Sequence, residues 1–133
     1  MALTAVETFE ALYVHVRAGE WEETEKYLSD DFIAYEPESL PYGGEWRGDN
    51  VFKRLFGTVM GTFDDPVVEG IDITGGDEWV YYSVNLSVSS KITGKRSTYR
   101  VIEHGRVIDG KLTELHLHYF DTAKMLKDLE GAP

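Results

Sequence analysis

Hydrophobic positions recur every three or four residues near the start of the chain and every second residue through most of its second half. The first spacing is typical of helices and the second of strands. Predicted helices lie at 4–19, 20–28, 49–63 and 121–129, and predicted strands at 32–36, 67–74, 79–90, 97–108 and 111–120. Helices followed by an antiparallel meander indicate an α+β fold, with the helices packed on one face of a curved sheet.

The length and composition indicate a single globular domain and exclude several other classes of protein. The chain has 133 residues, of which 42% are hydrophobic, and it has no cysteine. A chain of this length can bury a full hydrophobic core, so we expect a single domain over residues 1–133. The apolar content argues against disorder, and the lack of cysteine excludes a disulfide framework and a thiolate metal site.

The charge balance argues against two classes of partner. The chain has 24 acidic and 13 basic residues, a net charge of −11, and no basic stripe interrupts the surplus. Such a surface repels nucleic acid and anionic membranes. No apolar run approaches the roughly 20 residues that span a bilayer, and the N-terminus lacks the basic region of a signal peptide. We therefore expect a cytoplasmic protein that binds neither nucleic acid nor membrane.

Two turns set the predicted register of the sheet. Asp109-Gly110 is a strong two-residue hairpin signal, and Thr93-Gly94 is a second predicted turn. Counting from these turns gives the pairs Glu103–His116, Val101–His118 and Val84–Glu103. One face, predicted to be interior, then carries Val80, Tyr82, Val84, Leu86, Val88, Tyr99, Val101, Val107, Leu112 and Phe120, with Glu103, His116 and His118 among them. The other, mixed face includes Trp79, Tyr81, His104, Ile102, Leu115, Leu117 and Tyr119.

Glu103 is the most informative residue on the interior face. A carboxylate among apolar side chains is costly to keep charged, so it must be paired, protonated or exposed to a cavity. One interpretation is a structural ion pair between Glu103 and His116. The other is that Glu103 forms part of the wall of a pocket.

Several segments together resemble a known superfamily. These are AGEWEETEKYLSDDFIAYEP, the loop that ends GGEWRG, the segment YRVIEHGRVIDGKL and the ending HYFDTA. In this order they are similar to nuclear transport factor 2-like proteins, in the branch of the ketosteroid isomerases and SnoaL-like polyketide cyclases. The resemblance covers nearly the whole chain and implies a cystatin-like fold, in which the sheet forms a cone-shaped pocket.

The resemblance also implies roles for particular residues. In bacterial ketosteroid isomerases the acid before the proline after the first strand is the general base, and Glu36 occupies that place before Pro37. A second, protonated acid on the third long strand matches Glu103. Both positions are Asp in that family. The family's oxyanion-binding tyrosine on the first helix falls on Leu12, with Tyr13 about 100° further around the helix. Dehydratases of this fold pair histidine with a carboxylate, which would suit His116, His118 and Glu103.

Two functions from different classes follow. The first is a cofactor-free acid/base enzyme of the isomerase, cyclase or dehydratase type, acting on a small, largely apolar carbonyl compound. Glu36 would be its base, Glu103 its acid or hydrogen-bond donor, and His116 and His118 its helpers. The second is a non-catalytic small-molecule binding or interaction domain of the same fold. In either case the expected ligand-binding residues are Leu12, Tyr13, Tyr82, Val84, Leu86, Val101, Phe120 and, at the rim, Trp46.

Two further expectations concern metals and assembly. Two histidines two positions apart on a strand arise easily by chance, so no metal site is expected at His116 and His118. The apolar side chains of the mixed face would leave an exposed patch, and relatives of this fold commonly pair through that face of the sheet. We therefore expect a homodimer built on these strands.

Overall fold

The structure is a computed structural model and describes residues 3–130. Its helices are α1 (Ala5–Arg17), α2 (Trp21–Glu25), α3 (Val51–Thr62) and α4 (Thr122–Glu130). Its strands are β1 (Leu28–Glu36), β2 (Gly44–Arg47), β3 (Asp64–Gly75), β4 (Trp79–Ser89), β5 (Arg96–Ile108) and β6 (Lys111–Tyr119). The predicted order of elements is confirmed, apart from β2, which lies inside the segment predicted to be a loop.

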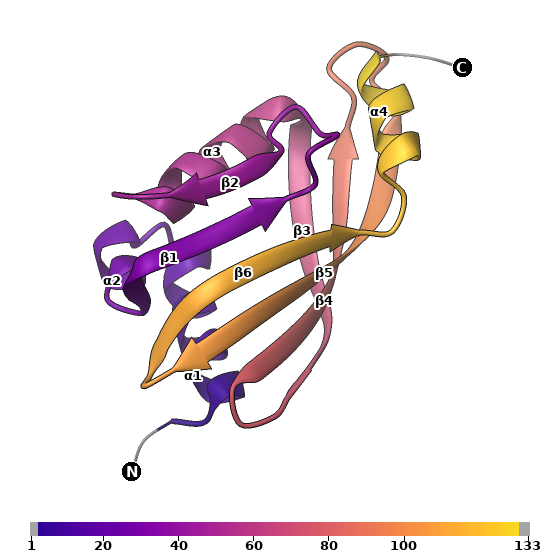
Figure 1. Cartoon of the computed structure of the whole chain (residues 1–133). Helices are drawn as coiled ribbons and strands as arrows, with labels where there is room; N and C mark the ends of the chain where they lie inside the picture. The colour runs from indigo at the N-terminus through magenta and orange to yellow at the C-terminus, as the bar shows by residue number, and fades with distance from the viewer. Residues whose placement is uncertain (1–2, 131–133) are drawn as a thin grey trace.

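The six strands form one sheet in the order β2-β1-β6-β5-β4-β3. All neighbouring strands are antiparallel except β1 and β6, which run parallel. Figure 1 shows α1, α2 and α3 on one side of this curved sheet. We call that side the inner face and the opposite side the outer face. The α+β fold class is therefore confirmed.

Local sequence signals explain how α1 begins and ends. Thr4 caps the helix by accepting a hydrogen bond from the backbone N–H of Glu7, while the Glu7 side chain accepts one from the backbone N–H of Thr4. The chain then leaves the helix at Gly19, whose φ of +69° suits glycine. The apolar stripe of α1 packs against β3, β4, β5 and β6, so the helix covers the centre of the sheet.

The register of β5 and β6 differs from the prediction after the first two pairs. Ile108 pairs with Lys111 and Val107 with Leu112, but Arg106 then pairs with Glu114, which leaves Thr113 as an extra residue on β6. Such a β-bulge shifts the alternation by one and exchanges the two faces of the strand beyond it. Leu115, Leu117 and Tyr119 therefore point to the inner face, and the prediction that they lie on the mixed face is wrong.

The same bulge moves the two histidines. His116 pairs with His104, and His118 pairs with Ile102, whereas Glu103 pairs with Leu117. His116 and His118 therefore lie on the outer face, on the opposite side of the sheet from Glu103. The predicted pairs of Glu103 with His116 and of Val101 with His118 are wrong, and a Glu103–His116 ion pair is excluded.

The register of β4 and β5 differs by two residues, which leaves the faces unchanged. The turn is longer than predicted, because the backbone N–H of Ser90 donates to the Lys95 carbonyl, at 3.0 Å, and encloses four residues. Val84 consequently pairs with Val101, and Tyr82 pairs with Glu103. The predicted pair of Val84 with Glu103 is wrong, but the interior face of these two strands is confirmed.

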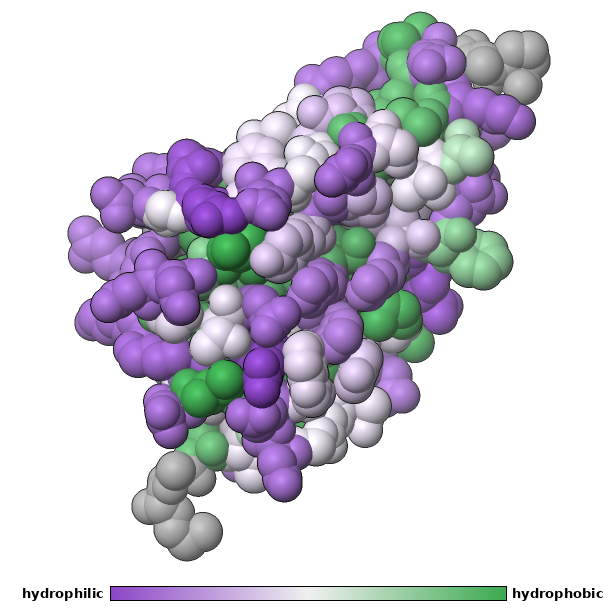
Figure 2. Space-filling model, in the orientation of Figure 1, coloured by the Kyte–Doolittle hydropathy of each residue, from purple (hydrophilic) through white to green (hydrophobic). Residues whose placement is uncertain are grey.

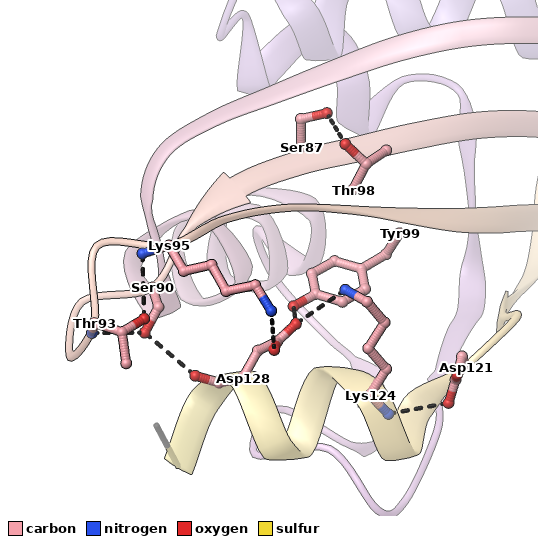
Figure 3. A network of polar contacts seen from close by, with 9 residues as sticks. All are labelled: Ser87, Ser90, Thr93, Lys95, Thr98, Tyr99, Asp121, Lys124 and Asp128. Atoms are coloured by element: carbon pink, nitrogen blue, oxygen red, sulfur yellow. Dashed lines mark hydrogen bonds and ion pairs between the residues drawn. The ribbon is translucent and has the colours of Figure 1, made fainter. Parts of the chain in front are cut away.

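Helix α4 packs over the end of the sheet formed by β4 and β5. The Met125 side chain of this helix is fully buried. Figure 3 shows the polar contacts that hold the helix: the Tyr99 hydroxyl donates to the Asp128 carboxylate at 2.5 Å, and the Ser90 hydroxyl donates to the Asp128 carbonyl at 3.2 Å. Phe120 lies in the link between β6 and α4 and is 86% exposed, so its predicted interior position is wrong.

No helix within residues 3–130 is both long enough and apolar enough to cross a membrane.

Candidate functional site

A cavity of about 130 Å³ lies between the inner face of the sheet and helices α1 and α3. Its wall is mainly apolar, with two carboxyl groups, Glu36 and Glu103, and three tyrosines, Tyr13, Tyr82 and Tyr119. A cavity of this size suits a single six-membered ring, since an engineered apolar cavity of about 150 Å³ binds benzene. Polar groups that converge in an apolar cavity are typical of ligand sites.

Glu36 is the last residue of β1, and its side chain is 6% exposed. Its Oε1 atom is buried and contacts no hydrogen-bond partner among the described residues. Burial raises the pKa of the Glu36 carboxyl to about 8, and the nearby charge of Glu103 adds to the rise. A buried carboxyl group with a free oxygen in a cavity is available to a ligand.

Glu103 lies in the middle of β5 and is 7% exposed. The Tyr13 hydroxyl, from the third turn of α1, donates a hydrogen bond to its Oε1 atom. Burial raises the pKa of the Glu103 carboxyl to about 7, while the hydrogen bond from Tyr13 and the charge of Arg17 oppose the rise. Tyr13 itself stays protonated, because burial and the Glu103 charge hold its pKa well above the ordinary value.

The two carboxyl groups differ in their surroundings. Glu103 has a hydrogen-bond donor and a cation nearby, whereas Glu36 has neither among residues 3–130. Groups that interact in this way exchange protons as a pair, and near neutral pH the pair holds at least one proton. One carboxyl group can then accept a proton while the other donates a hydrogen bond, which is the division of labour that acid/base chemistry needs.

The structure brings seven of the predicted site residues to this cavity. They are Glu36, Glu103, Tyr13, Tyr82, Val84, Leu86 and Val101. Leu12 is fully buried in the core and is not part of the cavity wall. Trp46 lies on β2, where its indole N–H donates to the Tyr42 carbonyl at 2.9 Å, so it fixes the loop and does not reach the cavity. Phe120 points to solvent, far from an interior position.

His116 and His118, predicted as catalytic helpers, are not in the site. The His116 ring stacks on Tyr35 with 4.7 Å between ring centroids, and its Nε2 atom lies 2.8 Å from the Glu114 carboxylate. His118 lies beside it, exposed on the outer face. Over the described part of the chain, no group of three or more histidine and acidic side chains is arranged to hold a metal ion.

The sequence interpretation also missed several residues of the cavity wall. Leu115, Leu117 and Tyr119 come from β6 beyond the bulge, and a row of side chains comes from α3: Phe52, Leu55, Phe56, Val59 and Met60. A signal for the bulge was present, because the apolar positions of β6 skip from Leu112 to Leu115 and then alternate regularly. The sequence analysis also missed Arg17, the only cation on the described wall, because this charged residue follows the last apolar residue of the stripe on α1.

Comparison with known families identifies the chain. The sequence model of the SnoaL-like domain matches residues 9–115, which is most of its length. The chain belongs to the SnoaL-like domain family. None of the curated proteins compared with this SnoaL-like chain matches it.

Solved structures support the same fold. TerC, crystallised with polyporic acid, has a TM-score of 0.79 at 20% identity, over 95% of the SnoaL-like chain and 98% of TerC. A nuclear transport factor 2-like protein from Burkholderia thailandensis gives 0.79 at 19% identity, over 96% and 98% of the two chains. IdmH, a candidate polyketide cyclase from Streptomyces antibioticus, gives 0.71 at 20% identity, over 92% and 96%. These TM-scores establish the nuclear transport factor 2-like fold of the SnoaL-like chain. Because the identities are low, its activity has to be argued from the site.

Proposed function

We propose that this SnoaL-like protein is a cofactor-free acid/base enzyme that moves a proton beside the carbonyl group of a small, largely apolar compound. The observation that carries the proposal is the pair of buried carboxyl groups, Glu36 and Glu103, on one apolar cavity. Burying two carboxyl groups in an apolar cavity costs stability, and buried groups with strongly raised pKa values cluster at functional sites. The names of TerC's ligand, polyporic acid, and of IdmH, a candidate cyclase, are consistent with a ligand of this kind.

The residues would divide the work as follows. The carbonyl oxygen of the ligand would lie by Tyr13 and Glu103, because within residues 3–130 the Tyr13 hydroxyl is the only one that donates to a carboxyl group of the cavity. The adjacent C–H group would lie by the free oxygen of Glu36. When the ligand draws the Tyr13 hydroxyl to its oxygen, Glu103 loses the bond that stabilises its carboxylate and keeps a proton more readily. Glu36 is then the group left to ionise and act as base.

The proposed step conserves atoms and charge. The Glu36 carboxylate takes the proton from the carbon, the electron pair of the C–H bond forms a carbon–carbon double bond, and the π pair of the carbonyl moves onto its oxygen to give an enolate. Tyr13 and protonated Glu103 donate hydrogen bonds to that oxygen, which is the electrostatic stabilisation that enolates need in a dry site. Where the enolate is conjugated with a second double bond, return of the proton from Glu36 to the far carbon gives an isomer. Attack of the enolate carbon on a second carbonyl gives a ring, and the new alkoxide oxygen takes the proton back from Glu36.

Hydrogen–deuterium exchange tests the proposal without knowledge of the natural substrate. Cyclohexanone, a six-membered ring of suitable size, is incubated with the protein in D₂O, and loss of the proton signal beside the carbonyl is followed by NMR. We expect protein-dependent exchange that Glu36→Gln reduces by about 10²-fold or more. Glu69→Gln, the same change at an exposed position of β3, is the control and should exchange like the wild type. Binding of the ketone with no exchange above the buffer rate would favour the non-catalytic binding domain instead.

We also propose that the outer face pairs two copies of the chain. Leu115, Leu117 and Tyr119, which were expected to form this interface, point inward instead. The outer face has a group of rings around His104. The ring centroids of Trp79, Tyr81 and His116 lie 4.5, 4.6 and 5.4 Å from that of His104. The Nε2 atom of His104 is buried without a hydrogen-bond partner among the described residues. In Figure 1, α1 lies behind the sheet, so Figure 2 looks onto the outer face. It shows mostly hydrophilic and intermediate side chains with separate hydrophobic areas, so the proposed interface is a mixed one.

A further inference from the structure

Arg17 is the one cation on the described wall of the cavity, in a chain with a net charge of −11. It follows Tyr13 by one helical turn, which places both side chains on the same side of α1. Two other arginines have acidic partners, Arg106 with Glu78 and Arg47 with Glu45. Within residues 3–130, no carboxylate forms an ion pair with Arg17.

The guanidinium group is nevertheless held in place. One of its nitrogens, Nη2, donates to the Tyr82 hydroxyl at 2.5 Å, and its central carbon lies 6.0 Å from the centre of the Tyr82 ring. The Tyr82 hydroxyl fits where it does because β3 has a glycine there: a Cβ atom on Gly70 would lie 2.3 Å from it. A guanidinium group has five N–H donors, and the Tyr82 hydroxyl accepts a hydrogen bond from only one of its nitrogens.

Arg17 and Tyr82 also stand at the boundary between two spaces. Both line the cavity, and both line a surface groove of about 520 Å³ between α1 and β3. The groove carries two acids of its own, Glu10 and Asp72, so a negative group is disfavoured along its outer part. The favourable place for a negative group is therefore beside Arg17, at the cavity end of the groove.

We propose that Arg17 binds an anionic oxygen group of the ligand, either a carboxylate or an ionised enol, at the junction of the cavity and the groove. The inference rests on the proposed function, since it names the substrate class of the same site: a small cyclic carbonyl compound with an acidic group. Guanidinium recognises such groups through paired N–H donors. An anion there would also offset the effect of Arg17 on Glu103, and so favour the protonated Glu103 that the proposed step requires.

Two matched pairs of probes test the proposal by NMR titration at pH 7.5. Benzoate and benzamide have nearly the same shape and differ in charge, and 1,3-cyclohexanedione, an acidic enol, is compared with neutral cyclohexanone. We expect the wild type to bind the anion of at least one pair about fivefold more tightly than its neutral partner, as suits an exposed ion pair. A preference in the first pair alone identifies a carboxylate, and in the second pair alone an enolate.

Three variants then decide the role of Arg17. Arg17→Met should abolish the preference for the anion, and Arg17→Lys, which keeps the charge, should retain part of it. Lys53→Met, which removes an exposed positive charge from α3, should bind all four probes like the wild type. Equal binding of anion and neutral partner by the wild type, or an unchanged preference in Arg17→Met, would overturn the proposal. These measurements need no turnover, so failure of the cyclohexanone exchange assay would reject the proposed function separately.

Discussion

The Tyr13 hydroxyl donates a hydrogen bond to the Glu103 carboxylate, and this contact joins residues 90 positions apart in the chain. Tyr13 is on α1 and Glu103 is on β5, so the bond crosses from the helical layer to the sheet inside the cavity. Both residues are at least 93% shielded from solvent, because Tyr13 is 5% and Glu103 7% exposed. A hydrogen bond to a buried carboxylate is strong and sets its protonation state.

Replacing Tyr13 by Phe tests this relationship directly. The hydrogen bond from Tyr13 lowers the pKa of Glu103, so its removal should raise that pKa above about 7. The same variant should slow proton exchange on cyclohexanone by about 10²-fold, the usual cost of losing an oxyanion donor. Carbon-detected NMR of the labelled Glu103 carboxyl measures the pKa. A Glu103 that titrates as in the wild type would show that Tyr13 does not act on it.

Glu36→Gln separates the proton-accepting role from ligand binding. The pKa of Glu36 is raised to about 8, so the exchange rate of the wild type should increase with pH until about pH 8, as the base becomes ionised. The variant should lose this increase and keep the affinity for cyclohexanone, because glutamine has the shape of the acid without its basicity. If the variant retains the wild-type rate and pH profile, Glu36 is not the base.

The fold was predictable from the sequence because most of its signals are local. The Thr4–Glu7 capping box and Gly19 define α1 within one or two residues. The interior face of β4 and β5 was also correct, although the loop between them is two residues longer than the predicted turn. An error of two in register changes the partners of Val84 and Glu103 but not their face, since strands alternate with period two.

Only part of the candidate site could be predicted from the sequence, because one extra residue in a strand moves the side chains beyond it to the opposite face of the sheet. Thr113 bulges out of β6, so Tyr119 enters the cavity while His116 and His118 leave it. Counting back from a correct hairpin turn cannot detect a bulge beyond it. Leu12 and Tyr13 show the same limit on the helix: the family resemblance selects Leu12, but the rotation of α1 on the sheet, set by tertiary packing, turns Tyr13 to the cavity.

The proposed dimer should weaken as the pH falls. Burial and the neighbouring rings of His116 and His118 lower the pKa of His104, so its neutral form is favoured on the outer face. Protonation of His104 at low pH therefore places a positive charge within the proposed interface, which opposes the pairing of two such faces. Glu114 offsets this charge only in part, since it contacts His116 and Arg106.

Sedimentation velocity at micromolar concentration measures this dimer. We expect a dimer at pH 7.5, a larger monomer fraction at pH 5.5, and a monomer for Tyr81→Glu at both pH values. Val14→Glu, which places the same charge on an exposed apolar position of α1, on the opposite side of the sheet, is the control and should remain dimeric. A wild-type monomer of 15.1 kDa at pH 7.5 would reject the outer-face dimer.

Glu103→Gln gives a test of the buried carboxyl group that needs no ligand. Burial raises the pKa of Glu103 from its ordinary value of 4.5 to about 7 in the folded protein, so the unfolded chain loses this proton at lower pH. The contribution of the group to stability is therefore complete below about pH 4.5 and declines as the pH rises to about 7. Glutamine imitates the protonated acid and can still accept the hydrogen bond from Tyr13.

We therefore expect Glu103→Gln to melt at least about 4 °C above the wild type at pH 8, which corresponds to about 1 kcal/mol for a chain of this size. The gain should disappear near pH 4, where both proteins carry an uncharged side chain at this position. Glu69→Gln, an exposed match, should change the melting temperature little at either pH. Because His116 lies on the other face, no ion pair is lost in the variant. A Glu103→Gln protein less stable than the wild type at pH 8 would mean that the ionised carboxylate, held by Tyr13 and Arg17, is the form the fold requires.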